Sequence, residues 1–162
     1  MKQIYRVLFI LLIGTISSQS YAQEKGQLNA SLDYVFGAGI AQNGGVNLAL
    51  EYFLTSKISA APSYTYYFSS GVKYGELNID GRYYFKWGKI QLYALAGYAN
   101  LNANGNVPIF GDVDESESGY NVGAGVLFPS GDRLSFNAQI KYSSPLDGQA
   151  YYQIGISYRL NK

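Results

Sequence analysis

AYYQIGISYRL, residues 150–160, is the stretch that decides the fold. Its residues alternate in kind, with one phase of a two-residue repeat apolar and the other polar or charged. Successive side chains of a strand point to opposite faces, so a strand here has one apolar face and one polar face. The apolar phase holds Tyr152, Ile154, Ile156, Tyr158 and Leu160, and the other phase holds Gln153, Gly155, Ser157 and Arg159. The pattern predicts a closing β-strand.

The first residues do not belong to the predicted fold. Lys2 and Arg6 give a positive start, residues 7–16 are apolar, and a small-x-small cleavage site ends at Ala22. This layout is typical of a secretory signal peptide. Cleavage there leaves one domain, residues 23–162. No other apolar run approaches the ~20 residues of a membrane-spanning helix, so a membrane protein with this sequence would span with strands.

Seven further segments alternate in the same way and are divided by Gly, Asn, Ser and Pro clusters. They are residues 28–36, 46–54, 58–68, 76–85, 90–99, 120–128 and 134–142. The links alternate in length, short at 55–57, 86–89 and 129–133, and longer at 37–45, 69–75, 100–119 and 143–149. Both features are typical of membrane barrels. We predict an all-β fold, an eight-stranded antiparallel up-and-down transmembrane β-barrel after a cleaved signal peptide. The termini and short turns are expected on the periplasmic side, and Pro62, which cannot donate to a ladder, near that end of its strand.

The charged residues of the segments indicate which phase meets lipid. All of them fall opposite the apolar phase, and a one-residue slip would turn any of them to the other face. They are Asp33, Glu51, Glu76, Asp80, Arg82, Lys141 and Arg159. The bore of an eight-stranded barrel is filled by side chains. We therefore expect a closed polar core in which the three bases neutralise the four acids, because buried charges persist only when they are paired and hydrogen-bonded.

The signal peptide, the strand spacing and the ending IGISYRL resemble the small single-domain outer-membrane β-barrels. These are the OmpX-like barrels, the OmpA-transmembrane-domain-like barrels and the porin-family barrels of Bacteroidetes. The resemblance covers the whole mature chain. It implies a Gram-negative outer-membrane location, and recognition of the last strand by the barrel-assembly machinery. In this chain Tyr158 and Leu160 hold the alternating positions of that strand, and Asn161 and Lys162 follow them.

The sequence contains few side chains that could carry out catalysis. The chain has no His and no Cys, which removes Ser-His-Asp hydrolysis and the usual transition-metal ligands, so neither catalytic residue nor cofactor is predicted. Glu76, Asp80 and Arg82 could be a catalytic cluster, but a structural ion-pair network is the preferred interpretation. The mature chain carries a net charge near −1, which does not favour nucleic-acid binding.

The longest link, from Asn100 to Gly119, is acidic. Asp112, Asp114, Glu115 and Glu117 resemble half of a calcium loop, but Gly123 stands where the bidentate acid would be. A solvated acidic loop is the preferred interpretation, and a site for divalent ions or for cations that bridge to lipopolysaccharide is the alternative. No metal site is predicted.

Three functions are compatible with this pattern. The first is a non-enzymatic structural or surface protein of the outer membrane, in contact with lipid and lipopolysaccharide, whose link between Asn100 and Gly119 meets external partners. The second is a narrow porin-like channel for small solutes. The third is a soluble periplasmic, lipocalin-like ligand binder, in which the apolar phase would point inward. The orientation of Leu48, Ile79, Val122 and Ile154 distinguishes the third from the others.

Overall fold

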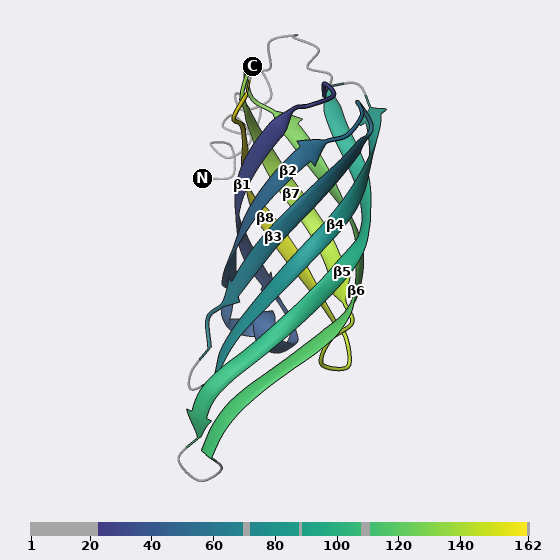
Figure 1. Cartoon of the computed structure of the whole chain (residues 1–162). Coiled ribbons are helices and arrows are strands. Elements are labelled where there is room, and N and C mark those ends of the chain that lie inside the picture. The colour runs from purple at the N-terminus through teal and green to yellow at the C-terminus, as the bar shows by residue number, and fades with distance from the viewer. Residues whose placement is uncertain (1–22, 70–71, 88, 108–110, 162) are drawn as a thin grey trace, which may run out of the picture.

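The computed structural model describes residues 23–69, 72–87, 89–107 and 111–161. The predicted signal peptide, residues 1–22, lies outside this range. Eight antiparallel strands form one closed barrel, in which each strand pairs with its neighbours in sequence and β1 pairs with β8 (Figure 1). The strands are β1 (Leu28–Gly37), β2 (Gly45–Phe53), β3 (Ile58–Tyr67), β4 (Lys73–Trp87), β5 (Ile90–Val107), β6 (Gly111–Pro129), β7 (Leu134–Ser143) and β8 (Gln149–Arg159). The predicted eight-stranded barrel is confirmed.

The two ends of the barrel differ. The short turns lie at one end together with both ends of the described chain, and we call this the terminal end (Figure 1). The opposite end, the loop end, carries a short 3-10 helix, η1 (Gly39–Asn43), between β1 and β2. No helix among the described residues is long and apolar enough to cross a membrane.

The prediction of a loop over residues 100–119 is wrong, because most of these residues form strand. β5 continues to Val107 and β6 begins at Gly111, and the two pair along their whole length, from Gln91–Leu127 to Val107–Gly111. The resulting hairpin projects beyond the other strands at the loop end (Figure 1). Within the described structure, pairing of β6 with β7 starts only at Asn121–Ser143, so residues 111–119 have one strand neighbour.

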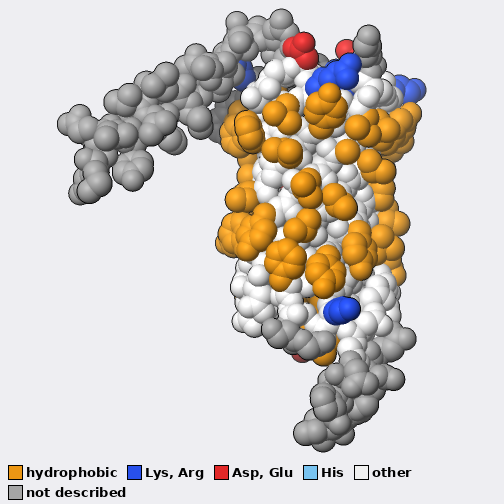
Figure 2. All heavy atoms as spheres, turned by 90° about the vertical axis from the view of Figure 1, so that its left-hand side faces the viewer, with side chains coloured by type: hydrophobic (Ala, Val, Ile, Leu, Met, Phe, Trp, Pro, Cys, Tyr) orange, Lys and Arg blue, Asp and Glu red, His pale blue; other side chains and the backbone are white. Residues whose placement is uncertain are grey.

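The apolar phase faces outward. Leu48, Ile79, Val122 and Ile154 are 60%, 52%, 45% and 51% exposed, although they are aliphatic residues in the middle of strands. Hydrophobic side chains form a band around the visible wall (Figure 2). Exposed aromatic side chains lie near the strand ends, among them Phe36, Tyr66, Phe85 and Phe128. A barrel with this surface needs an apolar solvent, and the soluble lipocalin-like alternative is wrong.

Pro62 lies in the middle of β3, opposite Ile79 of β4, and not at a strand end as expected. The ladder between β2 and β3 is interrupted at this point: the pair Ala49–Ser63 is followed by Tyr52–Ala60 in the same register. Proline has no N–H to donate, so a local gap in one ladder is its direct consequence.

Candidate functional site in the barrel interior

Glu51 and Arg82 form the first of two ion pairs inside the barrel. Glu51 on β2 and Arg82 on β4 approach to 3.3 Å between Oε2 and Nη1, and both side chains are buried. The other carboxylate oxygen of Glu51 accepts hydrogen bonds from Ser59 Oγ and from the Tyr84 hydroxyl, the latter at 2.7 Å. The Arg82 guanidinium also lies 5.0 Å from the centre of the Tyr93 ring. Each charge therefore has both an opposite charge and further polar or aromatic partners.

Asp80 and Lys141 form the second ion pair. Lys141 Nζ on β7 lies 3.3 Å from Asp80 Oδ2 on β4, and each side chain is only 1% exposed. The ammonium group also lies 5.8 Å from the ring centre of Tyr151 on β8. Lys141 thus links its own strand, β7, to β8 beside it and to β4 across the bore.

Glu76 has no basic partner among the described side chains, and is held by hydroxyl groups. Its carboxylate accepts hydrogen bonds from the Tyr67 hydroxyl at 2.7 Å, from Ser143 Oγ at 2.9 Å and from the Tyr151 hydroxyl at 3.2 Å. The residue is fully buried. Three donors can satisfy a buried carboxyl group without a cation.

Asp33 is bound through amides. Asn137 donates to Asp33 Oδ1 at 2.9 Å, and the Tyr93 hydroxyl donates toward Asn137 Oδ1 and Gln139 Oε1, at 2.9 and 2.8 Å. Gln139 in turn donates to Gln153 at 3.0 Å. The sequence places these side chains on the inward phase, but only the pairing across strands shows that they form one network.

Arg159 does not neutralise an acid in the core, contrary to expectation. It lies at the terminal end, where its guanidinium donates to Gln27 Oε1 at 2.7 Å. Gln27 also donates to Asn29 at 2.8 Å, and Gln23 donates to Gln91. The segment before β1 thus lies across the terminal mouth. The inward charges deep in the bore are Asp33, Glu51, Glu76, Asp80, Arg82 and Lys141.

Glycines on neighbouring strands make room for the large inward side chains. Six inward side chains pair directly with a glycine on the next strand. The pairs are Asp33–Gly155, Asp80–Gly97, Lys141–Gly123, Tyr93–Gly125, Tyr67–Gly45 and Tyr151–Gly37. A Cβ on Gly155 would lie 2.1 Å from a backbone carbonyl oxygen, and one on Gly125 would lie 2.3 Å from the Tyr93 ring. These positions therefore require glycine for space.

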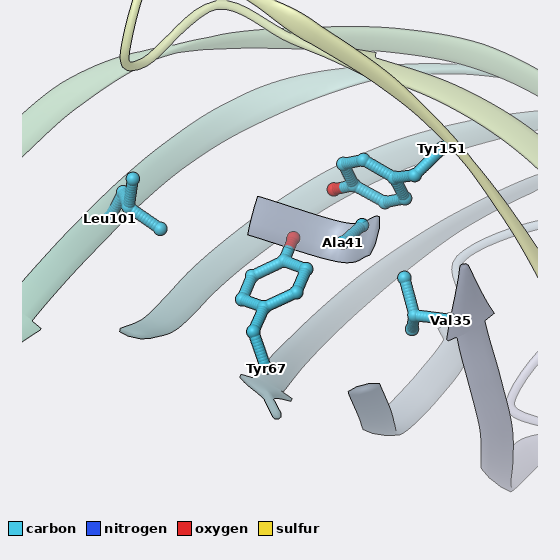
Figure 3. Packing of buried hydrophobic residues seen from close by; sticks show 5 residues of the cluster. All are labelled: Val35, Ala41, Tyr67, Leu101 and Tyr151. Carbon is cyan, nitrogen blue, oxygen red and sulfur yellow. The ribbon is translucent and has the colours of Figure 1, made fainter. Parts of the chain in front are cut away.

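Two buried apolar clusters lie in the bore, one toward each end of the barrel. At the loop end, Ala41 of η1 packs with Val35, Tyr67, Leu101 and Tyr151, and all five are buried (Figure 3). The Tyr67 and Tyr151 rings meet edge to face at 6.2 Å. Toward the terminal end, the buried cluster consists of Phe53, Tyr84, Tyr93, Leu95 and Leu127.

The described residues contain no group of three or more His, Cys, Asp or Glu side chains that could hold a metal ion. Glu115 and Glu117 are exposed on β6, and Glu117 accepts a hydrogen bond from the backbone of Leu146 at 3.1 Å. The side chains of Asp112 and Asp114 lie outside the described part. The structure thus supplies no geometry for the calcium alternative.

No role was predicted for Tyr67, Tyr84, Tyr93 and Tyr151, which are buried inside the barrel. In the structure their hydroxyl groups donate to Glu51, Glu76 and amide oxygens. The available signal was the choice of Tyr over Phe at inward positions, since a buried phenol needs a partner.

The chain matches the outer membrane protein beta-barrel domain over residues 8–161. No curated protein matches it. Among solved structures, the N-terminal β-barrel domain of Pseudomonas aeruginosa OprF is 18% identical, with a TM-score of 0.74 over 85% of this chain and 100% of that one. Ail of Yersinia pestis is 18% identical, with a TM-score of 0.59 over 83% and 97%. OprG of P. aeruginosa is 14% identical, with a TM-score of 0.60 over 87% and 99%. These likenesses show the fold.

Proposed function

This chain belongs to the outer membrane protein β-barrel domain family and is an integral outer-membrane protein, and from that premise we propose a non-enzymatic, non-conducting barrel with a structural and surface-display role. The observation that carries the proposal is the interior. Its six deep charges are fixed by ion pairs, hydroxyl groups and amides, and buried aromatic clusters lie on both sides of them. A network held in this way disfavours both catalysis by these groups and an open path for solute.

Conductance separates this proposal from a narrow channel. Purified protein in planar bilayers is expected to give no steady conductance steps, and vesicles that contain it should retain small solutes. A specific feature favours the channel: several buried polar atoms have no hydrogen-bond partner among the described residues, including Asn78 Nδ2, Asp80 Oδ1 and Arg82 Nε. Water could occupy such sites. Stable conductance steps that change on neutralising Asp80 would establish the channel and overturn the closed barrel.

We propose that residues 1–22 are a signal peptide, that the terminal end is periplasmic, and that the assembly machinery recognises β8. The short turns lie together with Gln23 and Asn161, the first and last described residues, as in other membrane barrels. Tyr158 and Leu160 are 44% and 48% exposed, so the outward face of the last strand is available to a partner during assembly.

The absence of cysteine provides a direct test of this topology. Ser116 lies on the hairpin at the loop end, Ser130 lies in the turn between β6 and β7 at the terminal end, and both are exposed. A membrane-impermeant maleimide should label Ser116→Cys in intact cells. It should label Ser130→Cys only after permeabilisation. The reverse pattern would invert the proposed orientation.

The β5–β6 hairpin is the surface that we propose for contacts with external partners. One edge of β6, residues 111–119, has no strand partner in the described structure, and an unpaired edge presents backbone N–H and C=O groups to an extended segment. Ail has been solved in complex with the heparin analogue sucrose octasulfate. In this chain, residues 100–119 contain four acids and no base, so a polyanion is disfavoured here. Replacing residues 104–114 with a tight turn should abolish partner capture and leave heat-modifiable migration on gels intact.

A further inference from the structure

Basic side chains surround the terminal end of the barrel. Lys57 lies in the turn between β2 and β3, Lys89 between β4 and β5, and Arg133 between β6 and β7, while Lys25 precedes β1. All four are exposed. Because the strands close in sequence order, these four positions divide the rim into roughly equal parts. We call these residues the basic collar. Blue side chains above the apolar band in Figure 2 belong to this end.

The loop end has the opposite charge. Among its described side chains, Lys73 is the one exposed base, whereas Glu115, Glu117 and Asp147 are exposed acids. At the terminal end, Glu24 and Asp132 are the described acids, fewer than the bases there. This difference in charge between the two ends does not stabilise the barrel core, because none of these side chains lies in the core.

The collar adjoins the apolar wall directly. Lys57 is followed by Ile58, and Leu54 stands three residues before it. Ile58 and Leu54 are exposed, at 43% and 49%. Lysine and arginine at such a boundary lay their methylene stems along apolar surface and hold the charge at headgroup depth. The groups found at that depth in a bilayer are lipid phosphates.

We propose that the basic collar binds the headgroups of anionic phospholipids in the leaflet at the terminal end. This inference rests on the proposed membrane insertion of the barrel. Charge complementarity favours an anionic over a zwitterionic lipid by about fivefold for each base at an anionic surface, an effect that falls off within about 8 Å at physiological salt. The loop end, being acidic, recruits no such lipid.

Trp87 makes the test specific, because it is the one tryptophan of the chain and ends β4 at the collar. Its fluorescence is measured in phosphatidylcholine vesicles that contain a small, equal fraction of brominated phosphatidylglycerol or brominated phosphatidylcholine. Bromine quenches at short range, so excess quenching by the anionic lipid reports its local enrichment. We expect at least twofold stronger quenching by brominated phosphatidylglycerol, and loss of the excess in molar salt.

The triple variant Lys57→Gln, Lys89→Gln, Arg133→Gln should quench equally with both lipids, and Lys73→Gln, at the other end, should keep the full excess. Folding of each variant is checked by heat-modifiable migration. Equal quenching in the native protein, or an undiminished excess in the triple variant, would overturn the proposal. Absence of quenching by either lipid would instead refute membrane insertion itself, so the two failures are distinguishable.

Discussion

Replacing Lys141 with Met should strongly destabilise the barrel. At 3.3 Å, the attraction between Lys141 and Asp80 is worth about 5 kcal/mol at an effective dielectric constant of ~20. The variant leaves Asp80 buried without its cation, and Asp80 Oδ1 already lacks a partner. Removal of one member of a buried pair typically costs about 3–5 kcal/mol, and we expect that loss in the free energy of unfolding.

The double variant Asp80→Asn, Lys141→Met should recover most of this loss, to within about 2 kcal/mol of the native protein, because neither charge then remains buried. Asn is the suitable replacement because its side chain has the same size and shape as that of Asp and carries no charge. Unfolding in urea is followed by Trp87 fluorescence and by heat-modifiable migration.

Lys73→Met is the matched control, since Lys73 is exposed at the loop end and should change stability by less than about 0.5 kcal/mol. The single variants Lys141→Met and Asp80→Asn are measured as well. If each costs less than about 1 kcal/mol and the two costs add up in the double variant, the reasoning is refuted, because Asp80 and Lys141 then do not depend on each other.

Three further pairs of substitutions test other parts of the wall and core. Gly155→Ala should cost about 1–3 kcal/mol in urea unfolding, because its Cβ would meet backbone, whereas Gly81→Ala, with the nearest atom at 3.6 Å, should be neutral. Glu76→Ala should cost about 3 kcal/mol, since it removes the acceptor of three buried hydroxyl groups, and Glu76→Gln should cost less. Ile79→Arg should cost about 2–4 kcal/mol in vesicles and Leu54→Arg, near the rim, about 0–1, and equal costs would contradict the assigned membrane depth.

The sequence was sufficient to predict which strand residues face outward and which face inward. Lipid outside the barrel favours apolar side chains and the polar interior favours polar ones, so alternate residues differ in kind. Leu48 and Asp80 had to face opposite ways wherever hydrocarbon lay outside, and the alternation of the strands carries that constraint. Hydrocarbon imposes this constraint only along the part of each strand that crosses the membrane.

The β5–β6 hairpin shows where this reasoning fails. The strand continues beyond Ala99, but its faces exchange character: Leu101 is buried, while Asn100 faces outward and donates to Ser116 and Ser118 at 3.0 Å. Outside the membrane an outward face can be polar. Because we required an apolar outward face, we predicted that this strand ends at residue 99, which is too early.

The partners of the interior charges could not be predicted for a different reason. That Glu76 meets Tyr67, Ser143 and Tyr151 depends on the relative register of β3, β4, β7 and β8. Alternation gives the face of a residue but not its height on the barrel. The pairing of Asp33 with Gly155 likewise depends on the register between β1 and β8.

The interior charges also explain how that register is held. A buried ion pair adds little net stability relative to a well-packed apolar pair, so Lys141 and Asp80 are poorly explained as a source of stability alone. A one-residue slip of β4, however, would turn Glu76, Asp80 and Arg82 together toward lipid. A base at mid-depth of a barrel wall costs about 2–4 kcal/mol and an acid somewhat less. A slipped strand would therefore lose more than the ion pairs contribute, and we infer that the charges specify one register against its neighbours.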